Sequence, residues 1–201
     1  MNSHQIRFDE DLVRRYDRSG PRYTSYPTAV QFSDRFGVNE YRAVAVASNQ
    51  DPIPRPLSLY VHIPFCSSPC FYCGCTKVIT RNHEKAEAYL YRLHREIELQ
   101  SQLYDRDREA EQLHFGGGTP TFLTSLEIDR LIEKLCSHFK LSSDPGREYS
   151  IELDPRTITR DTLRDLARVG FNRCSLGIQD FDPLVQEAVN RIQSVPDTLR
   201  L

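Results

Sequence analysis

Patterns typical of β-strands and of α-helices alternate along this chain from Leu57 onward, and this alternation limits the fold more than any other feature. The predicted strands cover residues 57–63, 111–115, 148–153 and 171–178. The predicted helices cover residues 84–103, 125–139 and 159–169. Alternating strands and helices form crossovers that place parallel strands in one sheet with helices outside. The sequence therefore predicts an α/β fold with about four strand–helix units.

Two of the predicted helices carry clear signals of their buried face and their start. In the first, apolar residues recur at helical spacing at Ala86, Leu90, Leu93 and Ile97. In the second, Thr124 and the Glu three positions later have capping-box spacing. Both helices are therefore expected to pack against the sheet.

The chain divides into an N-terminal arm, residues 1–56, and a core, residues 57–201. The arm holds a short amphipathic stretch at 12–16, an aromatic turn-rich segment at 20–29 and a stiff proline-rich link at 51–56. The last residues, 194–201, resemble the start of a helix. Because a closed eight-unit barrel takes about 250 residues, we expect a chain truncated at its C-terminal end, with an exposed strand edge and poor turnover when isolated.

Composition excludes several classes of protein. The 201 residues include 39% hydrophobic ones, which is ordinary for a globular protein. The net charge is −2, from 26 Lys and Arg against 28 Asp and Glu, so no broad basic field favours nucleic acid or a membrane surface. The N-terminus has no apolar signal sequence, and no run of apolar residues is long enough to span a bilayer. We expect a cytoplasmic protein, whose thiols stay reduced.

The loop after the first predicted strand holds four of the six cysteines, at positions 66, 70, 73 and 75. Thiolates are soft ligands that suit iron–sulfur clusters, zinc or copper(I). A structural zinc site usually has two C-x2-C pairs separated by a dozen or more residues, whereas the gaps here are three, two and one. The spacing favours an iron–sulfur cluster, and a zinc clip, a redox dithiol and a disulfide loop stay open. If Cys66, Cys70 and Cys73 hold three irons of a [4Fe-4S] cluster, the fourth iron lacks a protein thiolate.

Further candidate residues follow the other predicted strands. Gly116–Gly118 and Thr119 form a turn whose backbone could approach a ligand closely. Glu152 lies near the end of a predicted strand, and both of its neighbours are apolar, so its side chain faces the other side of the sheet. Gln179, Asp180 and Arg191 follow the last predicted strand. Taken singly, each of these residues is more often part of a tight turn, a helix cap or the protein surface than of a binding site.

Three more residues have simple structural interpretations. Cys136 and Cys174 fit small core residues. His62 is interpreted as a histidine of the core. The alternative is that its side chain supports the metal-binding loop without being a ligand.

Together, these segments resemble the radical S-adenosylmethionine superfamily, and within it the family of bacterial oxygen-independent coproporphyrinogen III oxidases. The resemblance rests on Tyr60-Val-His-Ile-Pro-Phe-Cys-x3-Cys-Phe-Tyr-Cys-Gly-Cys75, Gly-Gly-Gly-Thr-Pro120, Ile-Glu-Leu-Asp-Pro155 and Gly-Ile-Gln-Asp-Phe181. It implies a partial (β/α) barrel with parallel strands inside and helices outside.

The resemblance also implies roles for individual residues. Cys66, Cys70 and Cys73 would bind a [4Fe-4S] cluster whose open iron chelates S-adenosyl-L-methionine, and Cys75 would not be a ligand. Contacts to S-adenosyl-L-methionine are implied for Tyr60, Gly117, Gly118, Thr119, Glu152, Gln179 and Arg191. Tyr60 would lie beside the cluster, in a catalytic position. Arg22 and Tyr23 are candidates for binding the substrate, since a guanidinium matches a carboxylate.

The implied reaction is the oxygen-independent decarboxylation of coproporphyrinogen III to protoporphyrinogen IX by a 5′-deoxyadenosyl radical, in haem biosynthesis. An unidentified low-potential electron donor would be a partner. The alternatives are a haem-trafficking relative and a non-catalytic iron–sulfur or zinc module. The cysteine at position 75 and the arm with Arg22 and Tyr23 favour the oxidase, because trafficking relatives generally lack both.

Overall fold

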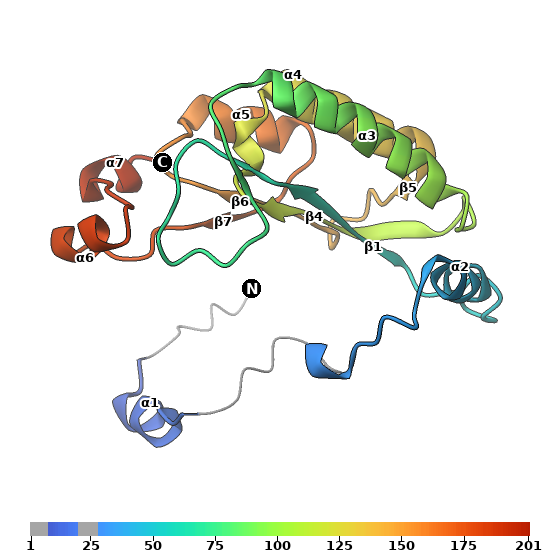
Figure 1. Ribbon diagram of the computed structural model, residues 1–201, viewed down its shortest axis with the longest axis horizontal. Helices are drawn as coiled ribbons and strands as arrows, with labels where there is room; N and C mark the ends of the chain where they lie inside the picture. The colour runs from blue at the N-terminus through green and yellow to red at the C-terminus, as the bar shows by residue number, and fades with distance from the viewer. Residues whose placement is uncertain (1–7, 20–27) are drawn as a thin grey trace. The chain divides into compact units, whose positions relative to one another are not determined.

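The computed structural model describes residues 8–19 and 28–201 (Figure 1). The chain forms two compact units, Met1–Tyr41 and Arg42–Leu201. In the first, α1 (Glu10–Tyr16) begins at Asp9, whose side chain accepts a hydrogen bond from Leu12 N, and η1 (Ala29–Gln31) follows. The predicted amphipathic stretch is helical, as part of α1, but buries none of its residues. Helix α2 (Val38–Ala47) crosses the division between the units.

The second unit is built on a parallel five-stranded sheet. Its strand order is β1-β4-β6-β7, and β5 pairs with the start of β4. The bounds are β1 Leu57–Ile63, β4 Glu109–Gly117, β5 Lys140–Leu141, β6 Glu148–Leu153 and β7 Arg173–Leu176. All pairings are parallel, so the carboxyl ends of the four main strands meet at one edge. The predicted α/β alternation, with four strand–helix units, is confirmed.

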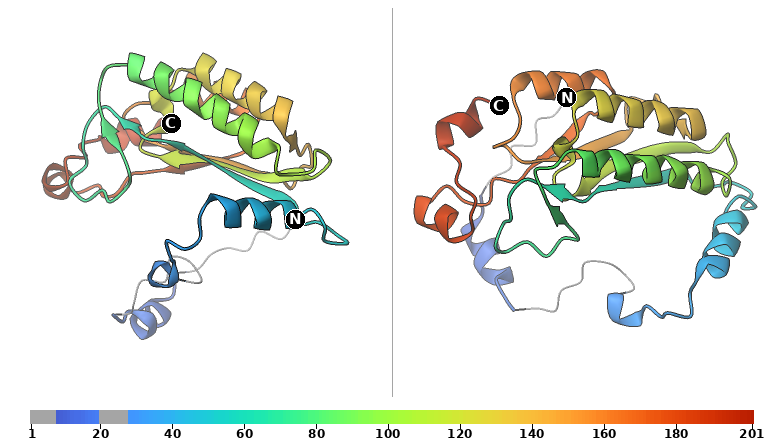
Figure 2. Two further views of the ribbon diagram at one scale, coloured as in Figure 1. Left: turned by 45° about the vertical axis from the view of Figure 1, so that its right-hand side comes forward. Right: turned by 45° about the horizontal axis from the view of Figure 1, so that its top comes forward.

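Three helices cover one face of this sheet (Figures 1 and 2). They are α3 Glu84–Ser101, α4 Ser125–His138 and α5 Arg160–Arg168. The residues predicted for the inner face of α3 are all buried, and in α4 both bonds of the capping box between Thr124 and Glu127 are present. The core lies between these helices and the sheet, around Leu113, Phe115 and Leu131, each with no exposed surface.

The other sheet face is polar, because strand side chains alternate. In β6, Ile151 and Leu153 are buried, with 1% and 3% of their surface exposed, whereas Glu152 is half-buried. Tyr60, on β1, and His114, on β4, lie opposite each other in the register and stack at a centroid distance of 5.7 Å. This alternation was predicted for Glu152, and it places the carboxylate away from the helices.

The structure corrects several boundaries. Strand β7 is shorter than predicted, β4 is longer, and α3 ends at Ser101. The pair β2 (Phe65–Cys66) and β3 (Val78–Ile79) was not predicted, because strands of two residues carry no periodic pattern.

The prediction that Cys136 and Cys174 are core residues is wrong, since both are exposed. Cys136 lies on the outer side of α4, and Cys174 lies on β7, which ends the strand order.

The chain continues from β7 into α6 (Pro183–Ala188) and α7 (Val195–Leu199), so the predicted terminal helix is present. None of the helices in the described ranges is long and apolar enough to cross a membrane. The functional split into an arm, 1–56, and a core, 57–201, stays a prediction.

Candidate functional site

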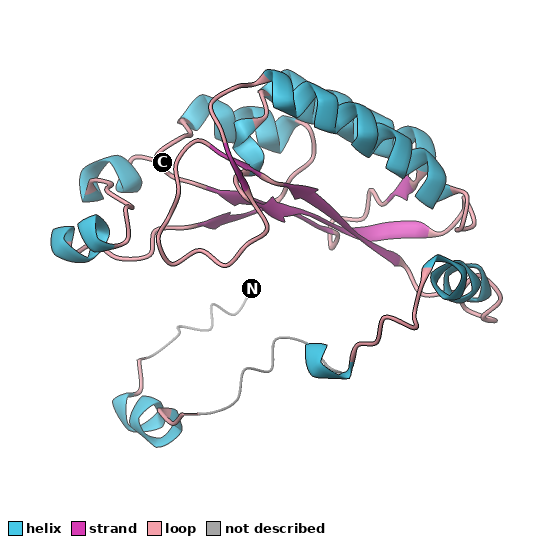
Figure 3. Ribbon diagram, viewed as in Figure 1, coloured by secondary structure: helices cyan, strands magenta, loops and turns pink. Residues whose placement is uncertain are grey.

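The cysteine loop runs between β2 and β3, which form a separate two-stranded sheet (Figure 3). The two short strands pair with each other, through Val78 N to Pro64 O at 2.7 Å and Thr80 N to Cys66 O at 2.9 Å. Inside the loop, Lys77 Nζ donates to the Cys73 carbonyl at 2.7 Å. Backbone hydrogen bonds therefore close the loop at its base, and Lys77 holds it from within. These contacts do not use the cysteine side chains, which can still bind a metal.

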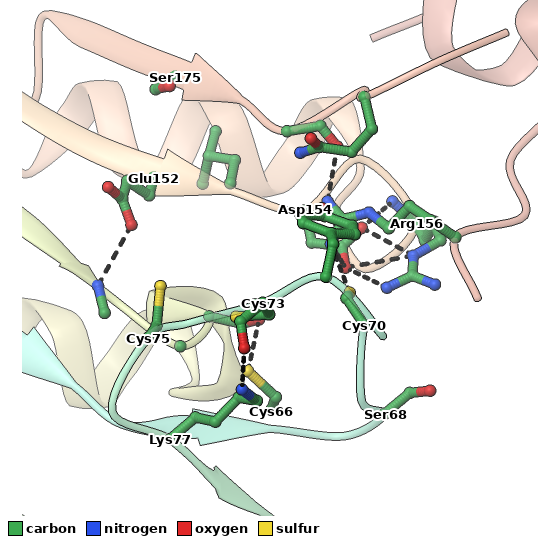
Figure 4. A pocket seen from close by; sticks show the side chains of 18 residues that line it. Cys66, Ser68, Cys70, Cys73, Cys75, Lys77, Glu152, Asp154, Arg156 and Ser175 are labelled. Carbon is green, nitrogen blue, oxygen red and sulfur yellow. Dashed lines mark hydrogen bonds and ion pairs between the residues drawn. The ribbon is translucent and has the colours of Figure 1, made fainter. Parts of the chain in front are cut away.

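A cavity of about 270 Å³ lies at the carboxyl edge of the sheet (Figure 4). It collects most of the residues that the sequence suggested for a cluster and a cofactor. Those that line it are Cys66, Cys70, Cys73, Cys75, Gly117, Gly118, Thr119, Glu152, Gln179 and Arg191. They come from β2, the cysteine loop and the ends of β4, β6 and β7, because parallel strands bring their carboxyl ends together, and Arg191 comes from the segment after α6.

The glycine turn packs directly against the start of the cysteine loop. Gly118 N donates to Ile63 O at 2.8 Å, and Thr119 N donates to Phe65 O at 2.9 Å. A Cβ on Gly118 would lie 2.8 Å from backbone atoms of Pro64. Gly117 has a φ of 112°, which side-chain-bearing residues rarely adopt. The turn therefore needs glycine at both positions to reach the cavity.

The thiols differ in their electrostatics. Burial raises the pKa of the Cys66 thiol, opposed by a hydrogen bond from Thr119 Oγ1, 3.5 Å from Cys66 Sγ. The hydrogen bond with Cys73 raises the pKa of Cys75, and burial adds to this shift. Burial also acts to raise the pKa of Cys73, but hydrogen bonds from Cys75 together with the charge and hydrogen bond of Lys77 outweigh it and lower that pKa. Within this pair, Cys73 is the favoured thiolate.

Glu152 is oriented by two neighbours, one of which is itself held by a third residue. Its Oε2 accepts from Gly117 N at 3.2 Å, and its Oε1 lies 3.4 Å from His114 Nε2. The other ring nitrogen of His114 lies 2.6 Å from Ser150 Oγ. These contacts hold a carboxylate at the rim of the cavity, where it can accept hydrogen bonds from a bound amine.

Arg191 is 8% exposed, so its charge is nearly fully buried. Its Nη1 lies 3.4 Å from Cys70 Sγ and 3.1 Å from Asp154 Oδ2, and its Nη2 donates to Gly177 O at 2.6 Å. Its Nε is buried and has no hydrogen-bond partner among the described residues. An unpaired buried donor is costly, and Arg191 is one of the residues that line the cavity.

Tyr60, Arg22 and Tyr23 are not among the residues that line the cavity in the described part of the chain. Tyr60 does not line the cavity; its hydroxyl lies 3.0 Å from His62 Nδ1, and burial together with the charge of Glu152 raises its pKa. His62 in turn contacts the Thr76 carbonyl at 2.9 Å, behind the cysteine loop. Arg22 and Tyr23 lie outside the described residues. The roles suggested for Tyr60, Arg22 and Tyr23 stay predictions.

Sequence reasoning missed Asp154 and Arg156, which also line the cavity. Asp154 is 6% exposed. Burial acts to raise its pKa, but hydrogen bonds from Arg156 and the charge of Arg191 outweigh it and lower that pKa. The available signal was the acidic residue at the carboxyl end of a predicted strand, directly before Pro155.

These residues fit a [4Fe-4S] cluster with S-adenosyl-L-methionine. The cavity offers soft thiols on one side, and a carboxylate, glycine backbone and an unpaired guanidinium donor on the other. Over residues 8–19 and 28–201, no three His, Cys, Asp or Glu side chains converge as ligands of a single metal ion. In a cubane cluster, each thiolate binds a different iron.

Comparison with known proteins gives the same result. Residues 60–201 match the family described as the radical SAM superfamily. The chain is 51% identical over 193 residues to oxygen-independent coproporphyrinogen III oxidase of Pseudomonas aeruginosa, covering 96% of this chain and 42% of that protein. It is 49% identical to the Escherichia coli K12 protein of the same name, of which it covers 41%.

Among solved structures, it matches that of coproporphyrinogen III oxidase (HemN) from Escherichia coli, described as a radical SAM enzyme. The TM-score is 0.79 at 46% identity, covering 96% of this chain and 41% of the other. The chain thus spans about two fifths of the length of these relatives, and its sheet and helices correspond to part of their barrel. With its family match over residues 60–201, this chain belongs to the radical SAM superfamily.

Proposed function

We propose that this chain forms the cluster- and cofactor-binding part of an oxygen-independent coproporphyrinogen III oxidase in haem biosynthesis. The observation that carries the proposal is the single cavity, in which thiols meet the glycine turn, Glu152, Gln179 and Arg191. The relatives at about 50% identity bear the oxidase name, which supports coproporphyrinogen III as the substrate.

Cys66, Cys70 and Cys73 would hold the cluster. Gly117, Gly118 and Thr119 would bind the amino-acid end of S-adenosyl-L-methionine, with Glu152 on its amine and Arg191 on its carboxylate. When bound, the two groups would supply a 5′-deoxyadenosyl radical able to remove a hydrogen atom from a propionate side chain, after which loss of carbon dioxide and of one electron to an acceptor would leave a vinyl group. An electron donor of low potential is required, and the chain's own residues orient the reactants and exclude water.

The remaining residues take roles around this site. Gln179 has a φ of 72° at the carboxyl side of β7, where its side chain lines the cavity, and we assign it to cofactor binding. Tyr60 would contact the cluster and cofactor from the polar sheet face. Arg22 and Tyr23 would bind a substrate carboxylate.

The test is anaerobic reconstitution of the chain with iron and sulfide, followed by electron paramagnetic resonance of the reduced sample. We expect about four irons per chain and a signal that changes when S-adenosyl-L-methionine is added. Zinc as the only bound metal would contradict the cluster. A signal that ignores S-adenosyl-L-methionine would contradict the cofactor site.

Substrate assignment needs a separate assay. Coproporphyrinogen III is incubated anaerobically with reductant, S-adenosyl-L-methionine and the reconstituted protein, and the porphyrin products are separated after oxidation. Formation of protoporphyrinogen IX supports the oxidase. Cofactor cleavage without any substrate decarboxylation, in a protein known to be complete, would instead favour a haem-trafficking role.

A further inference from the structure

Two contacts tie the cysteine loop to the segment that follows α6, on either side of Cys70. Phe71 N donates to Val189 O at 3.1 Å. Asn190 Nδ2 donates to Pro69 O at 2.6 Å. The backbone before and after Cys70 is thereby fixed to a part of the chain far away in sequence.

Asn190 suits this place for a backbone reason as well. Its φ is 55°, in the left-handed region that asparagine tolerates better than most residues. Arg191 N donates to Gln186 O at 2.8 Å, and Asn190 N donates to Glu187 O at 3.1 Å, which is the Schellman pattern that ends a helix. One residue therefore ends α6, aims its side chain at the cysteine loop and sets the direction of Arg191.

A second set of contacts fixes the same region from β6. Asp154 accepts from Arg156 Nη2 at 2.7 Å and pairs with Arg191 Nη1 at 3.1 Å. Arg156 Nη1 also donates to the Asn190 carbonyl at 3.3 Å. Because a buried carboxylate is costly unless paired, Asp154 holds both guanidinium groups in place, and Arg191 Nη1 lies 3.4 Å from Cys70 Sγ.

We propose that Asn190 and Asp154 are positioning residues that hold Cys70 and Arg191 in one fixed arrangement. Asn190 acts through the backbone of the cysteine loop, and Asp154 acts through the two guanidinium groups. The inference rests on the proposed function, in which Cys70 binds the cluster and Arg191 the cofactor carboxylate. Asp154 pairs with the Nη1 of Arg191, and the Nε of Arg191 has no hydrogen-bond partner among the described residues.

The first test uses the chain without its cluster. Asn190→Gly keeps the left-handed backbone and removes only the side-chain amide. In protein labelled with 15N-phenylalanine, the Phe71 amide should exchange its hydrogen at least tenfold faster in this variant. Asn82→Gly, a change at an exposed asparagine before α3, is the control and should leave Phe71 unchanged. Equal Phe71 exchange in Asn190→Gly and the unsubstituted chain would overturn the proposal for Asn190.

The second test follows cofactor binding in the reconstituted protein. Asp154→Asn and Asn190→Gly should still bind iron, because the three cysteines are unchanged. We expect a rise of about tenfold to a hundredfold in the concentration of S-adenosyl-L-methionine at which half of the change in the paramagnetic signal has occurred. Losses of this size are typical when a residue that orients a ligand is replaced. Asp165→Asn, at a partly exposed ion pair on α5, is the control and should not shift it. An unshifted midpoint in both site variants would overturn the positioning role.

The two tests separate this inference from the proposed function. If the unsubstituted protein shows no response to S-adenosyl-L-methionine, the proposed function fails. The exchange of the Phe71 amide then still decides whether Asn190 holds the cysteine loop. If Asp154→Asn folds poorly, Asn190→Gly alone can test the positioning role, because this variant leaves the buried ion pairs intact.

Discussion

Cys70 and Cys75 belong to the same loop but have different surroundings. Cys70 Sγ faces the Arg191 guanidinium at 3.4 Å, beside the pair formed by Asp154 and Arg156. Cys75 is exposed, and the charge of Glu152 contributes to raising its pKa. The two thiols therefore differ in the charged groups beside them, and the proposed function assigns cluster binding to Cys70 and not to Cys75.

Serine substitutions should separate the two roles. We expect Cys75→Ser to keep the iron and sulfide content of the reconstituted chain, and Cys70→Ser to lose most of it, because only the latter removes a cluster ligand. The measurement is iron and acid-labile sulfide per chain, together with the paramagnetic signal. Equal losses in the two variants would show that Cys75 is also a ligand.

Two glycines allow a matched test of the close approach between loops. Gly118→Ala places a Cβ 2.8 Å from the backbone of Pro64, which cannot move without disturbing β2. Overpacking of this kind costs about 1–3 kcal/mol. Gly74→Ala meets nothing within 4 Å and should change the free energy of unfolding by less than about 0.5 kcal/mol. Denaturant unfolding measures both, and similar effects would contradict the packing argument.

At the scale of elements, α3 and α4 pack side by side over the sheet and share a charged contact. Glu98 of α3 lies 2.7 Å from Lys134 Nζ of α4 and 2.8 Å from Arg95 Nη1 on its own helix. Hydrogen bonds from Lys134 and Arg95 lower the pKa of Glu98 to about 2. The contact joins two helices whose inner faces are already fixed by apolar packing.

This contact predicts a defined dependence on pH. Because the folded pKa of Glu98 is below its ordinary value of 4.5, its contribution to stability is complete above that pH and is lost as the pH falls toward 2. In Glu98→Gln, the loss of stability between these two pH values should be smaller than in the unsubstituted chain. Unfolding midpoints measured across this range test it, and a direct NMR titration of the Glu98 carboxyl should give a midpoint near 2. Parallel curves for the two proteins would contradict the prediction.

At the scale of the whole molecule, β7 ends the strand order within the part of the chain that the structure describes. Its residues Arg173, Cys174 and Ser175 are exposed. Unpaired backbone groups at an edge can pair with another chain, and a charged side chain there opposes such pairing. An exposed strand edge was expected from the sequence, and it lies at β7.

Edge pairing should therefore show as self-association. We expect the isolated chain to associate as its concentration rises, and Cys174→Lys to reduce this association. Cys136→Lys, a matched change at an exposed cysteine on α4, should not. Sedimentation velocity under reducing conditions measures both. Equal behaviour of the two variants would show that association does not use the β7 edge.

Local sequence determined the elements of this protein. The alternating pattern of 57–63 and 148–153 predicted β1 and β6 at their observed bounds, because a strand with one buried face repeats every two residues. The helical spacing of Ala86 and Leu90 predicted the inner face of α3. The cysteine spacing and the motifs after the strands predicted which residues to look at, and most of them line one cavity.

Only the tertiary structure decided how those residues act on one another. Arg156 and Asn190 carry no pattern of their own, and the contacts around the cavity join residues as far apart in sequence as Pro69 and Asn190. The exposure of Cys174 depends on which strand ends the sheet, which is likewise a property of pairing. Sequence periodicity reports the side of an element that is buried. Distances between side chains at the ends of different strands arise only when the sheet has formed.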